Sequence, residues 1–142
     1  MKFYTIKTPS IIQRVFSSYR WRFYSVTKEI YLTFDDGPTP EITTFVLNEL
    51  KKHQAKATFF CIGKNVKKHP TIYERIKKEG HSVGNHTYNH LNGFRTNNIN
   101  YIENIQQAEK LIESNLFRPP YGRLKSSQAR SIIGKGYKII MW

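Results

Sequence analysis

Cysteine and acidic residues are scarce in this chain of 142 residues. Cys61 is the single cysteine, which excludes an intrachain disulfide framework and a cysteine-based zinc site. The sequence also lacks any run approaching the roughly 20 apolar residues that a membrane-spanning helix needs. It carries 10 Asp and Glu against 23 Lys and Arg, a net charge of +13, which favours polyanionic surroundings such as nucleic acid, anionic lipid or an acidic cell-wall polymer.

Aspartate occurs only as the adjacent pair Asp35 and Asp36. The preceding residues 30–34 are β-branched, aromatic or aliphatic, and they predict a strand that ends at the two carboxylates. Successive side chains at a strand end point to opposite sides of the sheet, so the two carboxylates can take different roles. An Asp-Asp-Gly sequence alone indicates only a turn, and its meaning depends on polar clusters further along the chain.

Strand and helix signals alternate from residue 29 onward. Strands are expected at 30–34, 57–62, 81–84, 116–117 and 137–142. Helices are expected to begin at Pro40 and Pro70, to cover 102–112, and to begin again at Ser126. The apolar face of the first helix is expected to consist of Ile42, Phe45, Val46 and Leu50. The alternation predicts one α/β domain with parallel strands and right-handed crossovers.

Residues 1–28 form a predicted basic, aromatic arm that precedes the domain at 29–142. Lys and Arg interrupt every apolar run of the arm, so it shows neither a signal-peptide core nor a cleavage site. Residues 10–16 fit a short amphipathic helix. Two interpretations stay open: weak contact with an anionic membrane or cell-wall polymer, and packing against the domain as a cover.

Three polar clusters each follow a predicted strand. They are Asp35-Asp36, the segment 86–90 (His-Thr-Tyr-Asn-His) and the segment 118–121 (Arg-Pro-Pro-Tyr). In parallel α/β folds the carboxyl ends of the strands share one face, and active sites are built there. We therefore expect clusters that are far apart in the sequence to meet on one rim of the sheet.

The residue types at this rim suit a catalytic divalent metal ion. His86 and His90 can face one ion if their segment makes a helical turn, and a strand-end aspartate would be the third ligand. Such an ion lowers the pKa of bound water and polarises a carbonyl oxygen. Arg118 could keep the second carboxylate ionised, and a main-chain N–H near Tyr121 could meet a developing oxyanion. The pattern indicates metal-assisted hydrolysis of an amide or ester.

The segments 33–37 (Thr-Phe-Asp-Asp-Gly), 86–90 and 118–121 together resemble the first three motifs of the NodB-homology polysaccharide deacetylases, carbohydrate esterase family 4. The resemblance covers roughly residues 29–142. It implies a distorted (β/α) barrel, a zinc-like ion and removal of N-acetyl groups from amino-sugar polymers such as chitin and peptidoglycan. It also suggests a location in the cell envelope. The roles that it implies are Asp35 as base, Asp36, His86 and His90 as metal ligands, Arg118 as the group orienting the base, and the Tyr121 amide as part of the oxyanion hole.

The sequence departs from the family pattern after its third motif. No aspartate follows Asp36, and no Leu-x-His corresponds to the histidine that serves the family as general acid. We therefore expect an N-terminal part of the domain, an incomplete barrel of about five parallel strands with an open edge at 137–142.

Two other functions remain as alternatives to a deacetylase. The first is a non-catalytic metal-binding or glycan-binding remnant, because the last motifs are missing. The second is a basic nucleic-acid module, although the sequence contains no nucleic-acid motif. Any binding to nucleic acid is expected to be weak, non-specific and sensitive to salt.

Overall fold

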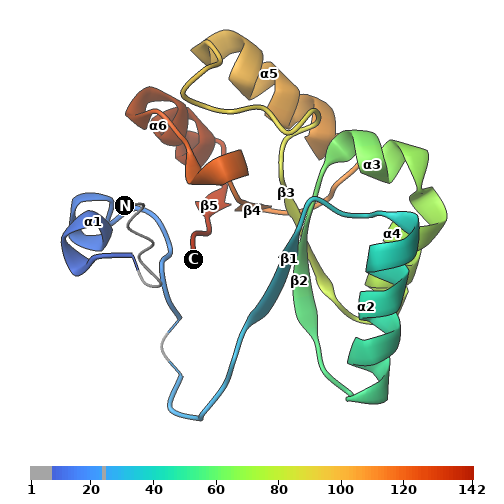
Figure 1. The fold of residues 1–142 in the computed structure, drawn as a ribbon. Coiled ribbons are helices and arrows are strands. Elements are labelled where there is room, and N and C mark those ends of the chain that lie inside the picture. The colour runs from blue at the N-terminus through green and yellow to red at the C-terminus, as the bar shows by residue number, and fades with distance from the viewer. Residues whose placement is uncertain (1–7, 24) are drawn as a thin grey trace, which may run out of the picture.

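The computed structural model describes residues 8–23 and 25–142, and its framework is a parallel sheet of five strands (Figure 1). The strands follow one another across the sheet in chain order: β1 (Leu32–Asp35), β2 (Ala57–Cys61), β3 (Ser82–Asn85), β4 (Leu116–Phe117) and β5 (Lys138–Ile139). Every neighbouring pair is parallel. The α/β class and the five parallel strands predicted from the sequence are thereby confirmed.

Helices fill the connections between the strands, and a further helix, α1, precedes β1. They are α1 (Ser10–Val15), α2 (Pro40–Lys52), α3 (Gly63–Lys68), α4 (Pro70–Lys78), α5 (Asn98–Glu109), the 3₁₀ turn η1 (Pro120–Gly122) and α6 (Ser126–Gly134). Proline occupies the first turn of α2 and of α4, where its missing N–H costs nothing. The short helix α3 was not predicted. The helix α6 begins at Ser126 as predicted, its N-cap is Lys125, and the side-chain oxygen of Gln128 accepts the N–H of Lys125.

The apolar face predicted for α2 is wrong in part. Leu47 and Leu50 are buried together with Thr43, whereas Ile42 and Phe45 are 70% and 64% exposed. Thr43 is tolerated inside because its hydroxyl accepts the N–H of Thr39 at 2.8 Å, which satisfies the polar group. The true inward stripe therefore begins with a polar residue, which hydrophobic spacing alone does not reveal.

The two faces of α2 should respond very differently to truncation. Leu47→Ala should lower the free energy of unfolding by about 2–5 kcal/mol, because Leu47 is fully buried and its loss leaves a cavity. Phe45→Ala removes a larger side chain from a mostly exposed position, and it should cost less than about 1 kcal/mol. Urea denaturation of both variants measures the difference. If Phe45→Ala lowered the free energy of unfolding more than Leu47→Ala does, the inward face of α2 would be the one that the hydrophobic spacing predicted.

Two groups of buried side chains form the core. The first joins β2 to α2, α3, α4 and the end of α5, and includes Leu47, Phe59, Cys61, Tyr73, Ile76 and Ala108. The second lies beneath α5, α6 and β5, and includes Tyr19, Tyr101, Ile105, Phe117, Ile132 and Ile139. Figure 1 shows the corresponding arrangement, with α2 and α4 beside β1 and β2, and α6 beside β5. Tyr19 brings the segment before β1 into the second core.

This N-terminal segment also covers the far edge of the sheet. The N–H of Arg20 donates to the carbonyl of Ile139 at 2.8 Å, and the N–H of Met141 donates to the carbonyl of Arg20 at 2.8 Å. These bonds form a parallel bridge between Arg20 and Ile140. The expected open edge at 137–142 is therefore wrong, and the packing agrees with the interpretation of the arm as a cover.

The edge of the sheet at β1 is different. Among the described residues β1 pairs with β2 alone. Beside this edge, Leu32, Phe34, Phe45 and Val46 line an apolar groove. In the part of the chain that the structure covers, no helix is long and apolar enough to cross a membrane.

Candidate functional site

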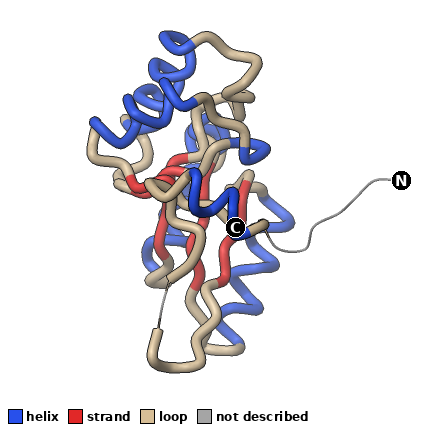
Figure 2. Tube along the Cα trace, turned by 90° about the vertical axis from the view of Figure 1, so that its left-hand side faces the viewer, coloured by secondary structure: helices blue, strands red, loops and turns tan. Residues whose placement is uncertain are grey.

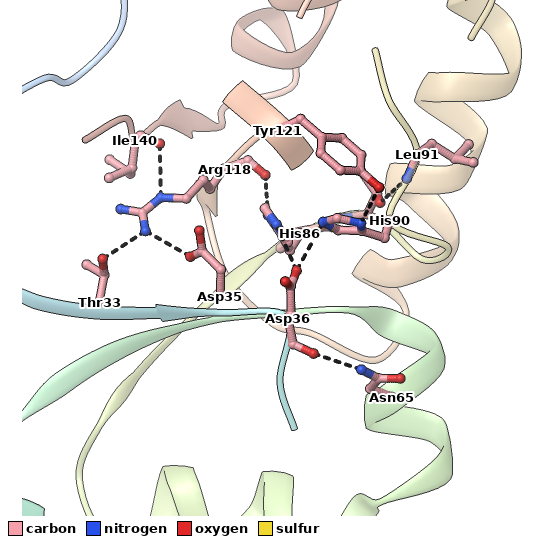
Figure 3. A network of polar contacts seen from close by, with 12 residues as sticks. Thr33, Asp35, Asp36, Asn65, His86, His90, Leu91, Arg118, Tyr121 and Ile140 are labelled. Carbon is pink, nitrogen blue, oxygen red and sulfur yellow. Dashed lines mark hydrogen bonds and ion pairs between the residues drawn. The ribbon is translucent and has the colours of Figure 1, made fainter. Parts of the chain in front are cut away.

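The three polar clusters meet where β1, β3 and β4 end. Asp35 is the last residue of β1, His86 directly follows β3, and Arg118 directly follows β4. The strand ends are in register, since Asp35 lies opposite Phe60, Cys61 opposite Asn85, and Asn85 opposite Phe117. Figure 3 shows the side chains of all six predicted site residues gathered at this rim.

Asp36, His86 and His90 form a triangle of possible metal ligands. Nε2 of His90 lies 3.0 Å from Oδ1 of Asp36, and Nε2 of His86 lies 3.5 Å from the same oxygen. One ligand atom from each residue lies within 4.8 Å of the other two. Ligands bound tetrahedrally at about 2.0–2.2 Å from one zinc ion lie on the order of 3.3 Å apart, so the spacing fits such an ion.

Main-chain and side-chain partners orient both imidazoles. Nδ1–H of His86 donates to the carbonyl of Arg118 at 2.6 Å, which leaves the lone pair of Nε2 facing Asp36. Nδ1 of His90 lies 3.1 Å from the Tyr121 hydroxyl, and the two rings are 4.6 Å apart between centroids. A carboxylate oxygen facing an imidazole lone pair calls for a cation between them. This donor set therefore fits a divalent metal, and the partners at Nδ1 are of the kind that metal-binding histidines have.

The electrostatics of the triangle favour the forms that bind metal. Its polar contact with His86, supported by His90, holds the pKa of the Asp36 carboxyl below its usual value and outweighs burial, which acts in the opposite direction. Burial lowers the pKa of His90 and outweighs the opposing effect of Asp36. An ionised carboxylate and neutral imidazoles are the states in which these groups coordinate a cation.

Asp35 faces away from the triangle and pairs with Arg118. Nη1 of Arg118 donates to Oδ1 of Asp35 at 2.8 Å and to the hydroxyl of Thr33 at 2.8 Å. The guanidinium is almost fully buried, and it lies 4.1 Å from the centroid of the Phe60 ring. Its Nε donates to the carbonyl of Ile140 at 3.4 Å. Arg118 therefore holds the Asp35 carboxylate in one orientation.

Unusual backbone conformations are concentrated at this rim. Asp36, Thr87, His90 and Tyr121 all have positive φ, between 57° and 69°, which is uncommon for residues other than glycine. Specific contacts sustain the strain, since the Asn65 amide donates to the Asp36 carbonyl at 2.8 Å and Thr87 Oγ1 accepts the N–H of Leu91 at 3.1 Å. Strained residues of this kind cluster at functional sites.

The segment 86–90 does not form the helical turn that was expected to bring its two histidines together. It is a loop, and Asn104 anchors it by accepting the N–H groups of Tyr88 and Asn89 at 2.9 and 3.0 Å. Asn85 Oδ1 accepts the N–H of Thr87 at 2.9 Å. The histidines converge because positive φ at Thr87 and His90 reverses the loop.

Tyr121 borders the triangle with both its side chain and its main chain. Its side chain is 60% exposed, and its φ of 60° interrupts the 3₁₀ turn η1. No main-chain acceptor for its N–H is recorded among the described residues. This N–H is therefore a hydrogen-bond donor without a main-chain partner, next to a possible metal centre.

The Tyr121 hydroxyl should strengthen metal binding through His90. Tyr121→Phe keeps the ring against the imidazole and removes the partner of Nδ1, so we expect metal affinity to fall about tenfold, the lower end of such effects. Tyr101→Phe is a matched control, since the Tyr101 hydroxyl is buried without a partner in the described residues. Competition with a zinc chelator measures both affinities. Equal metal affinities of Tyr121→Phe and Tyr101→Phe would show that the Tyr121 hydroxyl does not strengthen metal binding by His90.

Comparison with known proteins identifies the family. A model described as polysaccharide deacetylase matches residues 25–140. The chain belongs to the polysaccharide deacetylase family. The resemblance to the NodB-homology enzymes that the sequence motifs indicated is confirmed.

Individual relatives agree with this assignment. A peptidoglycan-N-acetylglucosamine deacetylase of Bacillus cereus is 40% identical over 120 residues, which cover 80% of this chain and 44% of the relative. A chitooligosaccharide deacetylase of Azorhizobium caulinodans is 37% identical over 121 residues, covering 80% of this chain and 57% of the relative. The crystal structure of the peptidoglycan N-acetylglucosamine deacetylase Bc1960 matches with a TM-score of 0.82 and 36% identity, over 95% of this chain and 65% of that one. The chain thus spans roughly half the length of these curated relatives.

Three residues that contribute to the site were not found from the sequence. Thr33 binds Arg118, Asn65 holds the Asp36 carbonyl, and the Ile140 carbonyl accepts from Arg118. Thr33 could have been predicted from the sequence, because it lies two residues before Asp35 and strand geometry places both side chains on one face of the sheet. Nothing in the sequence singles out Asn65 or a main-chain carbonyl at residue 140.

Proposed function

We propose that the protein is a metal-dependent hydrolase that removes N-acetyl groups from an amino-sugar polymer of the peptidoglycan or chitin class. The observation that carries this proposal is the triangle of Asp36, His86 and His90 beside the separate Asp35–Arg118 pair. Metal ligation and proton transfer are thereby divided between two adjacent aspartates. The relatives named above act, by their names, on N-acetylated glycans.

Asp36, His86 and His90 would hold the ion, and zinc suits two imidazoles and one carboxylate. An ion bound there supplies Lewis acidity toward the acetamide carbonyl and lowers the pKa of water. The Asp36 side chain is 63% exposed, so the centre is open to a polymer chain arriving from solvent.

Asp35 is the proposed general base. Its carboxylate is fixed by Arg118 and remains about one-third exposed, so it can accept a proton from a water molecule at the rim. Arg118 holds the carboxylate in place through a charge-assisted hydrogen bond. The main-chain N–H of Tyr121 is the proposed donor to the carbonyl oxygen as negative charge develops on it.

For these 142 residues taken alone, the positions of the histidines favour a second candidate, a glycan-binding unit without turnover. The other three histidines lie away from the rim: His53 follows α2, His69 separates α3 from α4, and His81 is buried just before β3. None of them is placed to protonate the leaving amine. General acid catalysis typically contributes about 10²–10⁴-fold, so a chain of these 142 residues should deacetylate slowly.

Acetate release from chitooligosaccharide and from peptidoglycan, with zinc or cobalt present, tests the proposal. Asp35→Asn should remove whatever release the unmodified chain shows while glycan binding persists. Binding of metal and glycan with no acetate release from either substrate favours the second candidate. Equal release by Asp35→Asn and the unmodified chain would contradict the role of Asp35. The glycan class of the substrate also points to the cell envelope as the place of action.

A further inference from the structure

The helix α1 exposes its aliphatic side chains on the surface of the protein. None of its residues is buried, and Ile11 and Val15 are each 70% exposed. The two residues are four positions apart, so they lie on the same side of the helix. An exposed aliphatic pair on a helix with basic residues beside it is typical of a helix that lies at a membrane surface.

The segment that directly follows α1 attaches the helix to the protein. Phe16 stacks on Tyr19 at 5.3 Å between ring centroids, and Tyr19 is buried in the second core. The Nε1–H of Trp21 donates to the Phe16 carbonyl at 3.0 Å. Together with the bridge between Arg20 and Ile140, these contacts fix the direction in which Ile11 and Val15 point. Figure 1 shows α1 at one side of the molecule, and Figure 2 shows the molecule with that side facing the viewer.

The sequence segment that contains this helix carries only positive side-chain charges. Residues 1–28 contain no Asp or Glu, and their cationic residues are Lys2, Lys7, Arg14, Arg20, Arg22 and Lys28. Arg14 is exposed and lies on α1 between Ile11 and Val15, three residues from one and next to the other. Arg20 is exposed although its main chain is bonded to Ile139 and Met141.

We propose that α1 and the basic residues around it bind the surface of an anionic lipid bilayer. Ile11 and Val15 would enter the boundary between headgroups and acyl chains, while Arg14 and Arg20 contact the lipid phosphates. Ile11 and Val15 next to Arg14 favour a lipid bilayer as the partner. A soluble polyanion could bind the arginine but offers no apolar phase for the two aliphatic side chains. Because the arm is bonded to the edge of the sheet that carries the site, such attachment holds the site close to the membrane surface.

Flotation with lipid vesicles tests this surface independently of the chemistry at the rim. The full chain should bind vesicles of mixed phosphatidylcholine and phosphatidylglycerol, and bind pure phosphatidylcholine vesicles far less. Replacing both aliphatic residues, Ile11→Ser with Val15→Ser, should lower binding about tenfold or more. Arg14→Gln should lower it about fivefold, the effect of one basic residue near an anionic surface.

Ile99→Ser is the matched control, because Ile99 is an isoleucine on α5 that is 72% exposed. All these positions are exposed, so the variants should keep the thermal midpoint of the unmodified chain. Unchanged vesicle binding by the double variant would overturn the proposal. Binding to duplex DNA without binding to anionic vesicles would also overturn the proposal, because it would show that the arm binds soluble polyanions instead of lipid.

Discussion

Replacing Asp36 by alanine should abolish tight metal binding. The carboxylate faces Nε2 of both histidines, with Oδ1 at 3.0 Å from His90 Nε2 and 3.5 Å from His86 Nε2. Without it only two neutral imidazoles remain, and a single pair of histidines does not make a three-ligand zinc site. Affinity should fall by more than about 100-fold, beyond the range of indirect effects on a ligand. Titration of the metal-free chain with zinc, in competition with a chelator, measures this loss.

Asp35→Asn is the matched control for that experiment. It changes the neighbouring carboxylate to an isosteric amide, and Asp35 contacts Arg118 rather than the imidazoles. Metal affinity should stay close to that of the unmodified chain. If both substitutions weakened metal binding equally, the division of roles between the two aspartates would be wrong. Circular dichroism of both variants shows whether any loss reflects unfolding.

Arg118→Met should be the most destabilising substitution at the rim. The side chain is 4% exposed and connects Thr33, Asp35 and the Ile140 carbonyl. Removing it leaves the Asp35 carboxylate without its cation and the Thr33 hydroxyl without its donor. Loss of one partner of a buried ion pair costs about 3–5 kcal/mol. Because Asp35 stays partly exposed, we expect about 2–4 kcal/mol, measured by urea denaturation.

Arg123→Met provides the comparison for Arg118. Arg123 is exposed, and its recorded contact is with the Phe94 ring at 6.0 Å. Its loss should change the free energy of unfolding by less than about 0.5 kcal/mol. Similar effects of the two substitutions would show that the buried network around Arg118 adds nothing to stability.

The convergence of the site could be predicted because it follows from topology. Asp35, His86 and Arg118 each come directly after a strand, and parallel strands in chain order bring their carboxyl ends to one rim. The chemical types of the residues then indicated a metal centre beside a separate base. Both inferences use local sequence and a general rule of α/β folds, and neither needs long-range contacts.

The features that were not predicted correctly from the sequence depend on contacts between residues far apart in the chain. Positive φ at Asp36 and His90 cannot be expected from their residue types alone, and at Asp36 a bond from Asn65, 29 residues away, sustains it. The inward face of α2 was misjudged because a hydrogen bond makes Thr43 acceptable inside. The edge at 137–142 was expected to be open because nothing local shows that Arg20 pairs with it.

The position of Arg118 has a consequence for the order of folding. Its guanidinium joins Thr33, which is 85 residues earlier in the chain, to Ile140, which is 22 residues later. Contacts between residues so far apart in sequence carry a high loop-closure cost, so we expect them to form after the local β1–α2–β2 and β2–α4–β3 units. During synthesis, Asp35 and the histidines leave the ribosome well before Ile139 and Ile140 do. Asp35, the proposed base, therefore acquires its fixed orientation only after residues 139–140 dock between the arm and β4.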